Sequence, residues 1–197
     1  MLAIFKREFK SYFQNVIGWL FVAALLAVYG LYFYVYNLKN GYPYISYDLK
    51  GIGFIMMIAV PILTMRSLSD ERKTKTDQLM LTSPVSVGKI VAGKYFAMAA
   101  VYTIDIAIFA LSPLVLSIYG KVALSEAYVA LFGYWLYGLS CIAVGLFISS
   151  ISESVIISAI LTFAALFLSY MMQSITGLIS SSGNLLTKVL NCFDLYT

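Results

Sequence analysis

The stretch at residues 16–36, VIGWLFVAALLAVYGLYFYVY, runs for 21 positions without a charged side chain. An α-helix needs about 20 apolar residues to cross the ~30 Å hydrocarbon layer of a bilayer. The whole chain shares this bias: 61% of its 197 residues are hydrophobic, 11% are charged, and its mean hydropathy is +0.89. Soluble domains carry roughly 25% charged residues. The sequence therefore predicts an all-α integral membrane protein.

Four more apolar segments follow, and we expect them to span the membrane at residues 49–68, 95–119, 127–148 and 154–173. The first segment is too long and too aromatic for a cleaved signal peptide, so we interpret it as a retained span. Pro61 and Pro113 interrupt the second and third spans, where we expect ordinary kinks or gating hinges. The chain is predicted to form one polytopic domain over residues 1–197 with five spans.

Two amphipathic segments flank the spans. In residues 1–15, apolar side chains recur at spacings of three and four, and charged or polar residues fill the other face. This pattern, next to a membrane span, predicts a helix lying in the membrane interface. A second interfacial helix is expected at residues 184–193, with Asn184 as its N-cap. The apolar face of the first helix consists of Leu2, Phe5, Phe9, Tyr12, Phe13 and Val16.

Basic residues are unevenly divided between the two sides of the membrane. Nine lysines and arginines lie in the N-terminal segment and between the second and third spans, against four elsewhere. Because cytoplasmic connections carry an excess of Lys and Arg, the N-terminus and the connection at residues 69–94 are predicted to be cytoplasmic. The nine are Lys6, Arg7, Lys10, Arg66, Arg72, Lys73, Lys75, Lys89 and Lys94; the four are Lys39, Lys50, Lys121 and Lys188.

Composition also limits the function. The chain has no histidine, and its two cysteines, Cys141 and Cys192, lack metal-ligand spacing, so no metal site is expected. Without paired carboxylates or a nucleophile motif, an intramembrane enzyme is disfavoured. The Gly-Lys pairs at residues 88–89 and 93–94 lack the rest of a phosphate-binding P-loop, so this chain is not expected to hydrolyse ATP. The net charge is +4, but the basic residues flank apolar spans, so the charge does not indicate nucleic-acid binding.

The connection between the second and third spans, TMRSLSDERKTKTDQLMLTSPVSVGK at residues 64–89, combines dense charge with a short apolar turn. Thr76 is a suitable N-cap, and Asp77 suits the positive end of a helix dipole. Ser83 and Pro84 form a second helix start. The apolar turn at residues 79–81 either tucks against lipid headgroups or inserts into a groove on a cytoplasmic partner.

This connection resembles the signature of the permeases of type-2 ABC transporters, the ABC-2 superfamily. The shared pattern is R-x-L-x-x-E-R-x-x-x-T-x-x-L-(x)4-P-V-S-x-x-x-I-V-x-G-K, which runs from Arg66 to Lys94. The resemblance extends to the N-terminal helix, the charge distribution and the order of spans. It is greatest to the branch of gliding-motility-associated and nitrous-oxide-reductase-maturation permeases. The matching positions are Arg66, Leu68, Glu71, Arg72, Thr76, Leu79, Pro84, Val85, Ser86, Ile90, Val91, Gly93 and Lys94.

The resemblance implies a permease subunit in a bacterial cytoplasmic (inner) membrane. Two such subunits, identical or different, would pair around a path, and each would dock on a separate ATPase subunit that binds ATP and Mg²⁺ and drives export. No cofactor is expected in this chain itself. The docking residues implied are Arg66, Asp70, Glu71, Arg72, Thr76, Asp77, Leu79, Met80, Leu81 and Pro84.

Two departures from the family pattern stand out. Lys75 occupies a position where the family usually has glycine, which alters the local turn. The family has six spans, and the sixth is missing here, so we expect the sequence to be a shortened form of a longer chain. An ATPase-independent scaffold or channel-like protein remains the alternative function, although a channel is disfavoured because no filter-like segment is present.

Some residues inside the predicted spans are candidates for function. Asp105, deep in the third span, is either a proton or cation site on the path or a structural hydrogen-bond partner for a neighbouring span. Glu153 either caps the fifth span or contacts the ATPase. The resemblance implies that spans two and five line the path, although such residues at helical spacing also serve packing. The candidate lining residues are Phe54, Met57, Phe163 and Phe167.

Overall fold

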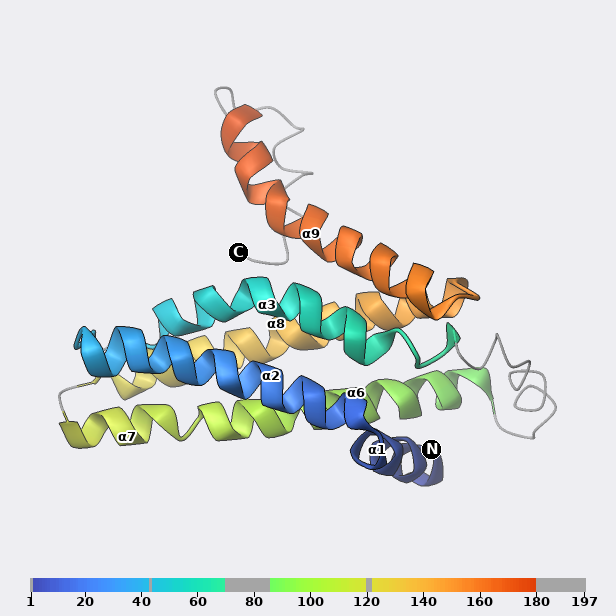
Figure 1. Cartoon of the computed structure of the whole chain (residues 1–197), viewed down its shortest axis with the longest axis horizontal. Helices are drawn as coiled ribbons and strands as arrows, with labels where there is room; N and C mark the ends of the chain where they lie inside the picture. The colour runs from blue at the N-terminus through green and yellow to red at the C-terminus, as the bar shows by residue number, and fades with distance from the viewer. Residues whose placement is uncertain (1, 43, 70–85, 120–121, 180–197) are drawn as a thin grey trace.

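The computed structural model describes residues 2–42, 44–69, 86–119 and 122–179 (Figure 1). In this part of the chain every regular element is a helix, which confirms the all-α prediction. The helices are α1 (Leu2–Gln14), α2 (Val16–Phe33), the π-helix η1 (Tyr34–Lys39), α3 (Ser46–Thr64), α6 (Val87–Phe109), α7 (Ser112–Tyr119), α8 (Leu124–Ile151) and α9 (Val155–Ile179).

Five segments are long and apolar enough to cross a membrane, as the sequence predicted: Val16–Lys39, Ser46–Thr64, Val87–Ile118, Leu124–Ile151 and Val155–Met172. Their bounds differ from the predicted ones mainly around the charged connection. The second span ends at Thr64 rather than at residue 68, and the third begins at Val87 rather than at residue 95. The expected interfacial helix at residues 184–193 lies outside the described residues.

The helices run back and forth, so their ends gather at two ends of the bundle (Figure 1). We call one the loop end: it holds α1, the residues on either side of segment 70–85, and the turn between α8 and α9. The far end holds the connections between η1 and α3 and between α7 and α8. This division places the segments predicted to be cytoplasmic at the same end.

Helix α3 lies at the centre and packs against α2, α8 and α9. Of its most apolar stretch 61% is buried, against 17% for α9, although α9 has the higher mean hydropathy, 2.2 against 1.5. Beyond the start of α9, which packs near α3 and α8, the helix leans away from the others (Figure 1). Most of the exposed apolar surface therefore belongs to the outer spans, as expected where lipid replaces water.

The third span breaks between Phe109 and Ser112, just before Pro113. Proline has no amide hydrogen, so the carbonyl four residues earlier loses its helical partner. The Ser112 hydroxyl donates to that Phe109 carbonyl at 2.7 Å and replaces the missing bond. Ser112 also forms a hydrogen bond with the Tyr29 hydroxyl, and the Tyr29 ring stacks on Phe109 at 4.0 Å between centroids. Pro113 thus produces the expected kink, and α2 holds it in place.

Helices α6 and α8 approach closely at Gly138. A β-carbon there would lie 2.3–2.5 Å from the ring and hydroxyl of Tyr102. Tyr102 has no room to yield, because its side chain is fully buried and its hydroxyl donates to the Tyr134 carbonyl at 2.7 Å. Gly133, on the same helix, has open space around it.

We predict that Gly138→Ala lowers the free energy of unfolding by about 1–3 kcal/mol through overpacking. Gly133→Ala should leave stability unchanged or raise it by up to about 1 kcal/mol, because alanine favours the helix. Thermal unfolding of the detergent-solubilised chain compares the two. Equal stability of both variants would contradict the packing described for Tyr102.

Candidate functional site

The charged connection leaves the bundle at the loop end, and the residues that hold its two ends form the candidate site. Its first end is Ser67–Ser69, after α3, and its second end is the start of α6. Most of the predicted docking residues, Asp70, Glu71, Arg72, Thr76, Asp77, Leu79, Met80, Leu81 and Pro84, lie outside the described residues. Of that set the structure places Arg66, which is exposed.

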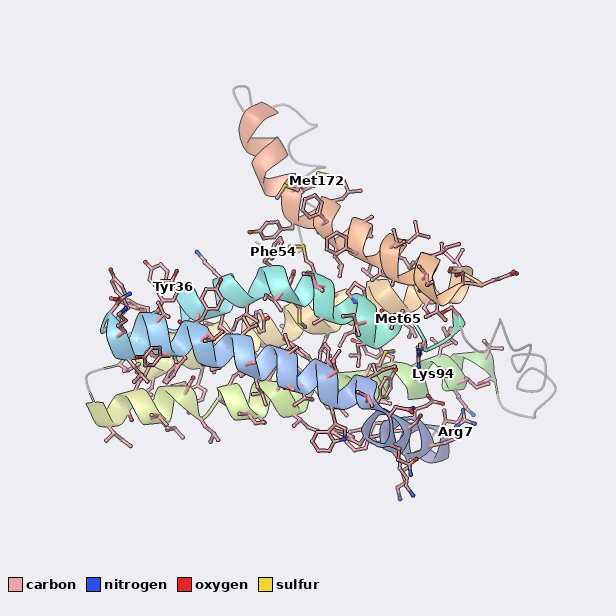
Figure 2. The ribbon with its side chains drawn as sticks, viewed as in Figure 1. Arg7, Tyr36, Phe54, Met65, Lys94 and Met172 are labelled. Atoms are coloured by element: carbon pink, nitrogen blue, oxygen red, sulfur yellow. The ribbon has the colours of Figure 1, made fainter. Side chains whose placement is uncertain are left out.

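Lys94 joins three elements at this site. Its side chain is only 2% exposed, and its ammonium group donates to the Ser67 carbonyl at 2.8 Å. The same nitrogen lies 3.5 Å from Glu8 Oε1 on α1, and Arg7 contacts Glu8 at 2.7 Å. Figure 2 shows Lys94 on α6 between the end of α3 at Met65 and α1 at Arg7. A buried ammonium needs such partners, so α1, α6 and the first end of the connection are tied together.

Ser149 on α8 holds the same first end from another side. Its hydroxyl oxygen accepts hydrogen bonds from the backbone amides of Leu68 and Ser69, both at 3.2 Å. Gly145, one turn earlier, lets α3 come close: a β-carbon there would lie 2.5 Å from Thr64 Oγ1. The chain therefore leaves α3 in a fixed direction, set by α8 as well as by α6.

Helix α1 also packs directly on the other helices of the site. Gly93 on α6 accommodates Ile4, whose side chain would lie 3.0 Å from an added β-carbon. The Tyr12 hydroxyl donates to the Leu63 carbonyl at 3.4 Å, in the last turn of α3. A helix is thus present at Leu2–Gln14, where one was predicted at residues 1–15; it packs on α6 and is bonded to the last turn of α3, and its interfacial location stays a prediction.

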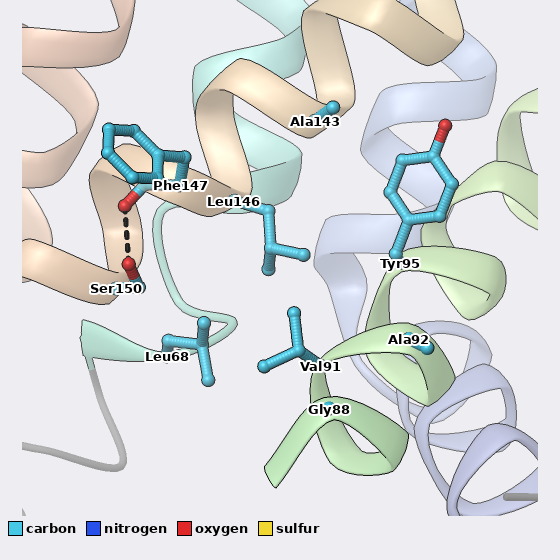
Figure 3. Close-up of a pocket in the computed structure, with 9 residues that line it drawn as sticks. All are labelled: Leu68, Gly88, Val91, Ala92, Tyr95, Ala143, Leu146, Phe147 and Ser150. Atoms are coloured by element: carbon cyan, nitrogen blue, oxygen red, sulfur yellow. Dashed lines mark hydrogen bonds between the residues drawn. The ribbon is translucent and has the colours of Figure 1, made fainter.

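An apolar hollow of about 500 Å³, the loop-base hollow, lies between the two ends of the connection. Figure 3 shows the side chains of Leu68, Val91 and Leu146 directed toward one another across it. Both hydroxyls in its lining donate to backbone carbonyls: Ser150 to Phe147 at 2.6 Å and Tyr95 to Leu139 at 3.3 Å. The hollow therefore offers hydrocarbon contact and no catalytic group. Its lining residues are Leu68, Gly88, Val91, Ala92, Tyr95, Ala143, Leu146, Phe147 and Ser150.

Sequence reasoning named Lys94 as part of the signature and of the basic residues that set the orientation, and it did not single out Glu8, Ser67 or Ser149. Glu8 carried a usable signal, because it is the one acid in a basic amphipathic segment. Ser67 acts through its carbonyl, which every residue has, and Ser149 is one of many serines near span ends. In the described part of the chain, no group of three or more acidic, histidine or cysteine side chains could hold a metal ion.

The candidate path residues lie elsewhere. Phe163 and Phe167 stack on each other on α9 with 5.9 Å between their ring centroids, and both are 37% exposed. Phe54 on α3 is 47% exposed and projects toward α9 (Figure 2). Its ring meets the Tyr170 ring edge to face, with 6.4 Å between the two centroids. Met57 is fully buried in the core, so it faces no open path in this conformation. Glu153 is exposed in the turn between α8 and α9.

Asp105 is fully buried on α6, and within the described part of the chain neither of its carboxyl oxygens has a hydrogen-bond partner. Among the described residues no neighbouring span donates a hydrogen bond to Asp105, so its expected role as a structural hydrogen-bond partner stays a prediction. Asp48, also fully buried, differs: it accepts a hydrogen bond from Asn37 and so joins α3 to η1 at the far end. The two buried acids thus differ in one respect: Asp48 has a hydrogen-bond partner at one of its oxygens, whereas Asp105 has one at neither among the described residues.

We predict that Asp105→Leu raises the free energy of unfolding by about 1–3 kcal/mol, because leucine has the same branching and no polar atom to leave unpaired. The matched variant Asp48→Leu should lower it by a similar amount, since Asn37 then loses its partner. Thermal unfolding in detergent measures both. A loss of stability in Asp105→Leu as large as that in Asp48→Leu would show that Asp105 has a stabilising partner.

Lys94→Met is predicted to lower the free energy of unfolding by about 1–3 kcal/mol, because the Ser67 carbonyl loses a charged donor and Glu8 keeps only Arg7 of its two cations. Lys89→Met, on the exposed first turn of the same helix, should change it by about 0.5 kcal/mol or less. Both are measured by thermal unfolding. Indistinguishable variants would mean that the buried ammonium contributes nothing to holding the site together.

Comparison with known proteins identifies the family. The model of the family described as ABC-2 family transporter protein matches residues 32–197. No similar curated protein and no similar solved structure was found. The matched region covers most of the chain, including the signature at residues 66–94 and four of the five apolar spans in full. With its all-helical, multi-span fold, this chain is a membrane-spanning transport component that belongs to the ABC-2 transporter family.

Proposed function

We propose that the chain is the non-catalytic permease subunit of an ABC transporter and that it exports its substrate using ATP hydrolysed by a separate ATPase subunit. Membership of the ABC-2 family supports the transporter role. The ATPase, with its ATP and Mg²⁺, the direction of transport and the branch of gliding-motility-associated and nitrous-oxide-reductase-maturation permeases are parts of the proposal.

The observation that carries this proposal is the way the charged connection is held at its base. Lys94 and Ser149 fix the Ser67–Ser69 segment from two different spans, and α1 joins them through Glu8. A connection attached so tightly passes a push on its outer part to α1, α6 and α8 together. Protein interiors are close-packed and transmit such displacements rather than absorb them. This is the mechanical property that a docking loop for an ATPase requires.

Docking itself we assign to segment 70–85, with Arg66 at its start. The apolar turn at residues 79–81 would insert into a groove of the ATPase, and the charges around it would form a polar rim. The positive charges of this segment also support a cytoplasmic location for the N-terminus and the loop end, in a bacterial inner membrane. The same end carries the basic helix α1, which agrees with that orientation.

A second permease subunit, identical or different, completes the proposed path. Helix α9 is the least buried span, and Phe163, Phe167 and Phe54 leave exposed aromatic surface on α9 and α3. A partner packed here would cover that surface and place it along a central path. Asp105 remains a proposed polar site for the cycle, because an unpaired buried acid is costly and a conformational change that hydrates or pairs it would relieve the cost.

Co-purification with an ABC-type ATPase subunit from the same organism tests the proposal. We predict that the wild type retains the ATPase and that Leu79→Asp loses it, since a carboxylate in the apolar turn cannot enter an apolar groove. Tyr44→Asp, a comparable change at an exposed position of the far end, should retain it. Retention by all three proteins would show that the connection is not the docking site. Absence of binding in the wild type would favour the ATPase-independent scaffold or channel.

A further inference from the structure

A second apolar groove, which we call the α6–α8 groove, opens on the exposed outer side of α6 and α8 and ends at Phe5 on α1. Its volume is about 520 Å³. Tyr95, whose hydroxyl donates to the Leu139 carbonyl at 3.3 Å, separates it from the loop-base hollow. The groove is lined by Phe5, Tyr95, Phe96, Ala99, Ala100, Thr103, Ile104, Ala107, Trp135 and Leu139.

The polar atoms in this groove are satisfied within the protein. The Trp135 indole donates to Thr103 Oγ1 at 3.1 Å, and the Thr103 hydroxyl donates to the Ala99 carbonyl at 2.7 Å. The surface that remains consists of alanine methyl groups between aromatic walls. An occupant therefore needs no polar group inside the groove, and a hydrocarbon chain meets that condition.

The length of the groove distinguishes a lipid chain from a protein helix. Along α6 it extends from Tyr95 to Ala107, which at ~1.5 Å per residue is about 18 Å. One leaflet contributes about half of the ~30 Å hydrocarbon layer. The groove thus matches the depth of a single leaflet, whereas a partner span would need a complementary surface across the whole layer.

The end of the groove at Phe5 lies beside positive charge. Phe5 is on α1, the amphipathic helix at the loop end, which also carries the exposed residues Lys6 and Lys10. Neither lysine has an ion-pair partner recorded in the described part of the chain, whereas Arg7 is paired with Glu8. An aromatic series through Phe5, Phe9 and Phe13 covers the apolar face of α1 and places this helix at the level of the headgroups.

We propose that the α6–α8 groove binds an acyl chain of an anionic phospholipid, whose phosphate is held by Lys6 and Lys10. The acyl chain fills the α6–α8 groove up to α1, and the headgroup neutralises the basic side of α1. The lipid thereby secures α1 against the spans that carry the charged connection. This inference depends on the membrane location of the fold and not on docking of an ATPase.

The test uses the full chain with Trp19→Phe, so that Trp135 is the remaining one of the two tryptophans. It is reconstituted in vesicles of phosphatidylcholine with brominated acyl chains, which quench tryptophan fluorescence on contact. Unbrominated phosphatidylglycerol is then added in increasing proportion. We expect the Trp135 fluorescence to recover at low phosphatidylglycerol fractions, well above the recovery that simple dilution of the brominated lipid gives.

Two changes separate the parts of the site. Ala100→Phe fills the groove, and Lys6→Gln with Lys10→Gln removes the headgroup charge; each should reduce the preference for phosphatidylglycerol about tenfold or more. The matched controls are Val129→Phe, on the lipid-exposed side of α8 outside the groove, and Lys39→Gln with Lys50→Gln at the far end. Both controls should behave as the unsubstituted protein does.

Three outcomes would overturn the proposal. If the Trp135 fluorescence recovers only as much as dilution of the brominated lipid gives, the protein has no preference for the anionic lipid. Trp135 fluorescence that brominated phosphatidylcholine does not quench would show that protein covers the groove. An unchanged preference in the double lysine variant, whose exposed positions do not affect folding of the core, would show that α1 does not bind the headgroup.

Discussion

The hydrocarbon core of a bilayer provides no hydrogen-bond partners, and every other feature of this structure depends on that constraint. Backbone amides and carbonyls have to bond within their own segment, so the spans are helices. Where Pro113 removes one amide, the Ser112 hydroxyl takes its place at the Phe109 carbonyl. The same constraint explains why side chains such as Tyr102 and Thr103 donate to backbone carbonyls instead of remaining free.

A buried acidic or basic side chain also needs a partner inside the protein, and the three buried in the described part of this bundle differ in whether they have one. Lys94 is buried and paired, and it joins α1 and the end of α3 to α6. Asp48 is buried and bonded to Asn37 at the far end. Asp105 is buried between these ends without a hydrogen-bond partner in the described residues. The bonded groups near the two ends stabilise this arrangement of helices, whereas a buried acid without a hydrogen-bond partner lowers its stability.

Helix α1 takes part in both the base of the charged connection and the α6–α8 groove. On one side it contributes Glu8 to the base of the charged connection, and on the other it contributes Phe5 to the α6–α8 groove. Its packing on α6 at Gly93 is close, so a change on either side would be felt on the other. An interfacial helix in this position relates the lipid surroundings of the subunit to the segment that we propose docks on the ATPase.

The sequence by itself determined the class of the fold, the five spans and the family, because long uncharged runs admit one structure in a bilayer and the signature at residues 66–94 is specific. It also determined that helix α1 is amphipathic. Only the tertiary structure decided which span is central, that Lys94 meets Ser67 and Glu8, and that Asp105 has no hydrogen-bond partner among the described residues. The physical reason is that all five spans are apolar around most of their circumference. Hydropathy therefore does not mark their contact faces, and those faces depend on close approaches such as those at Gly138 and Gly145, which arise only when two distant segments are packed together.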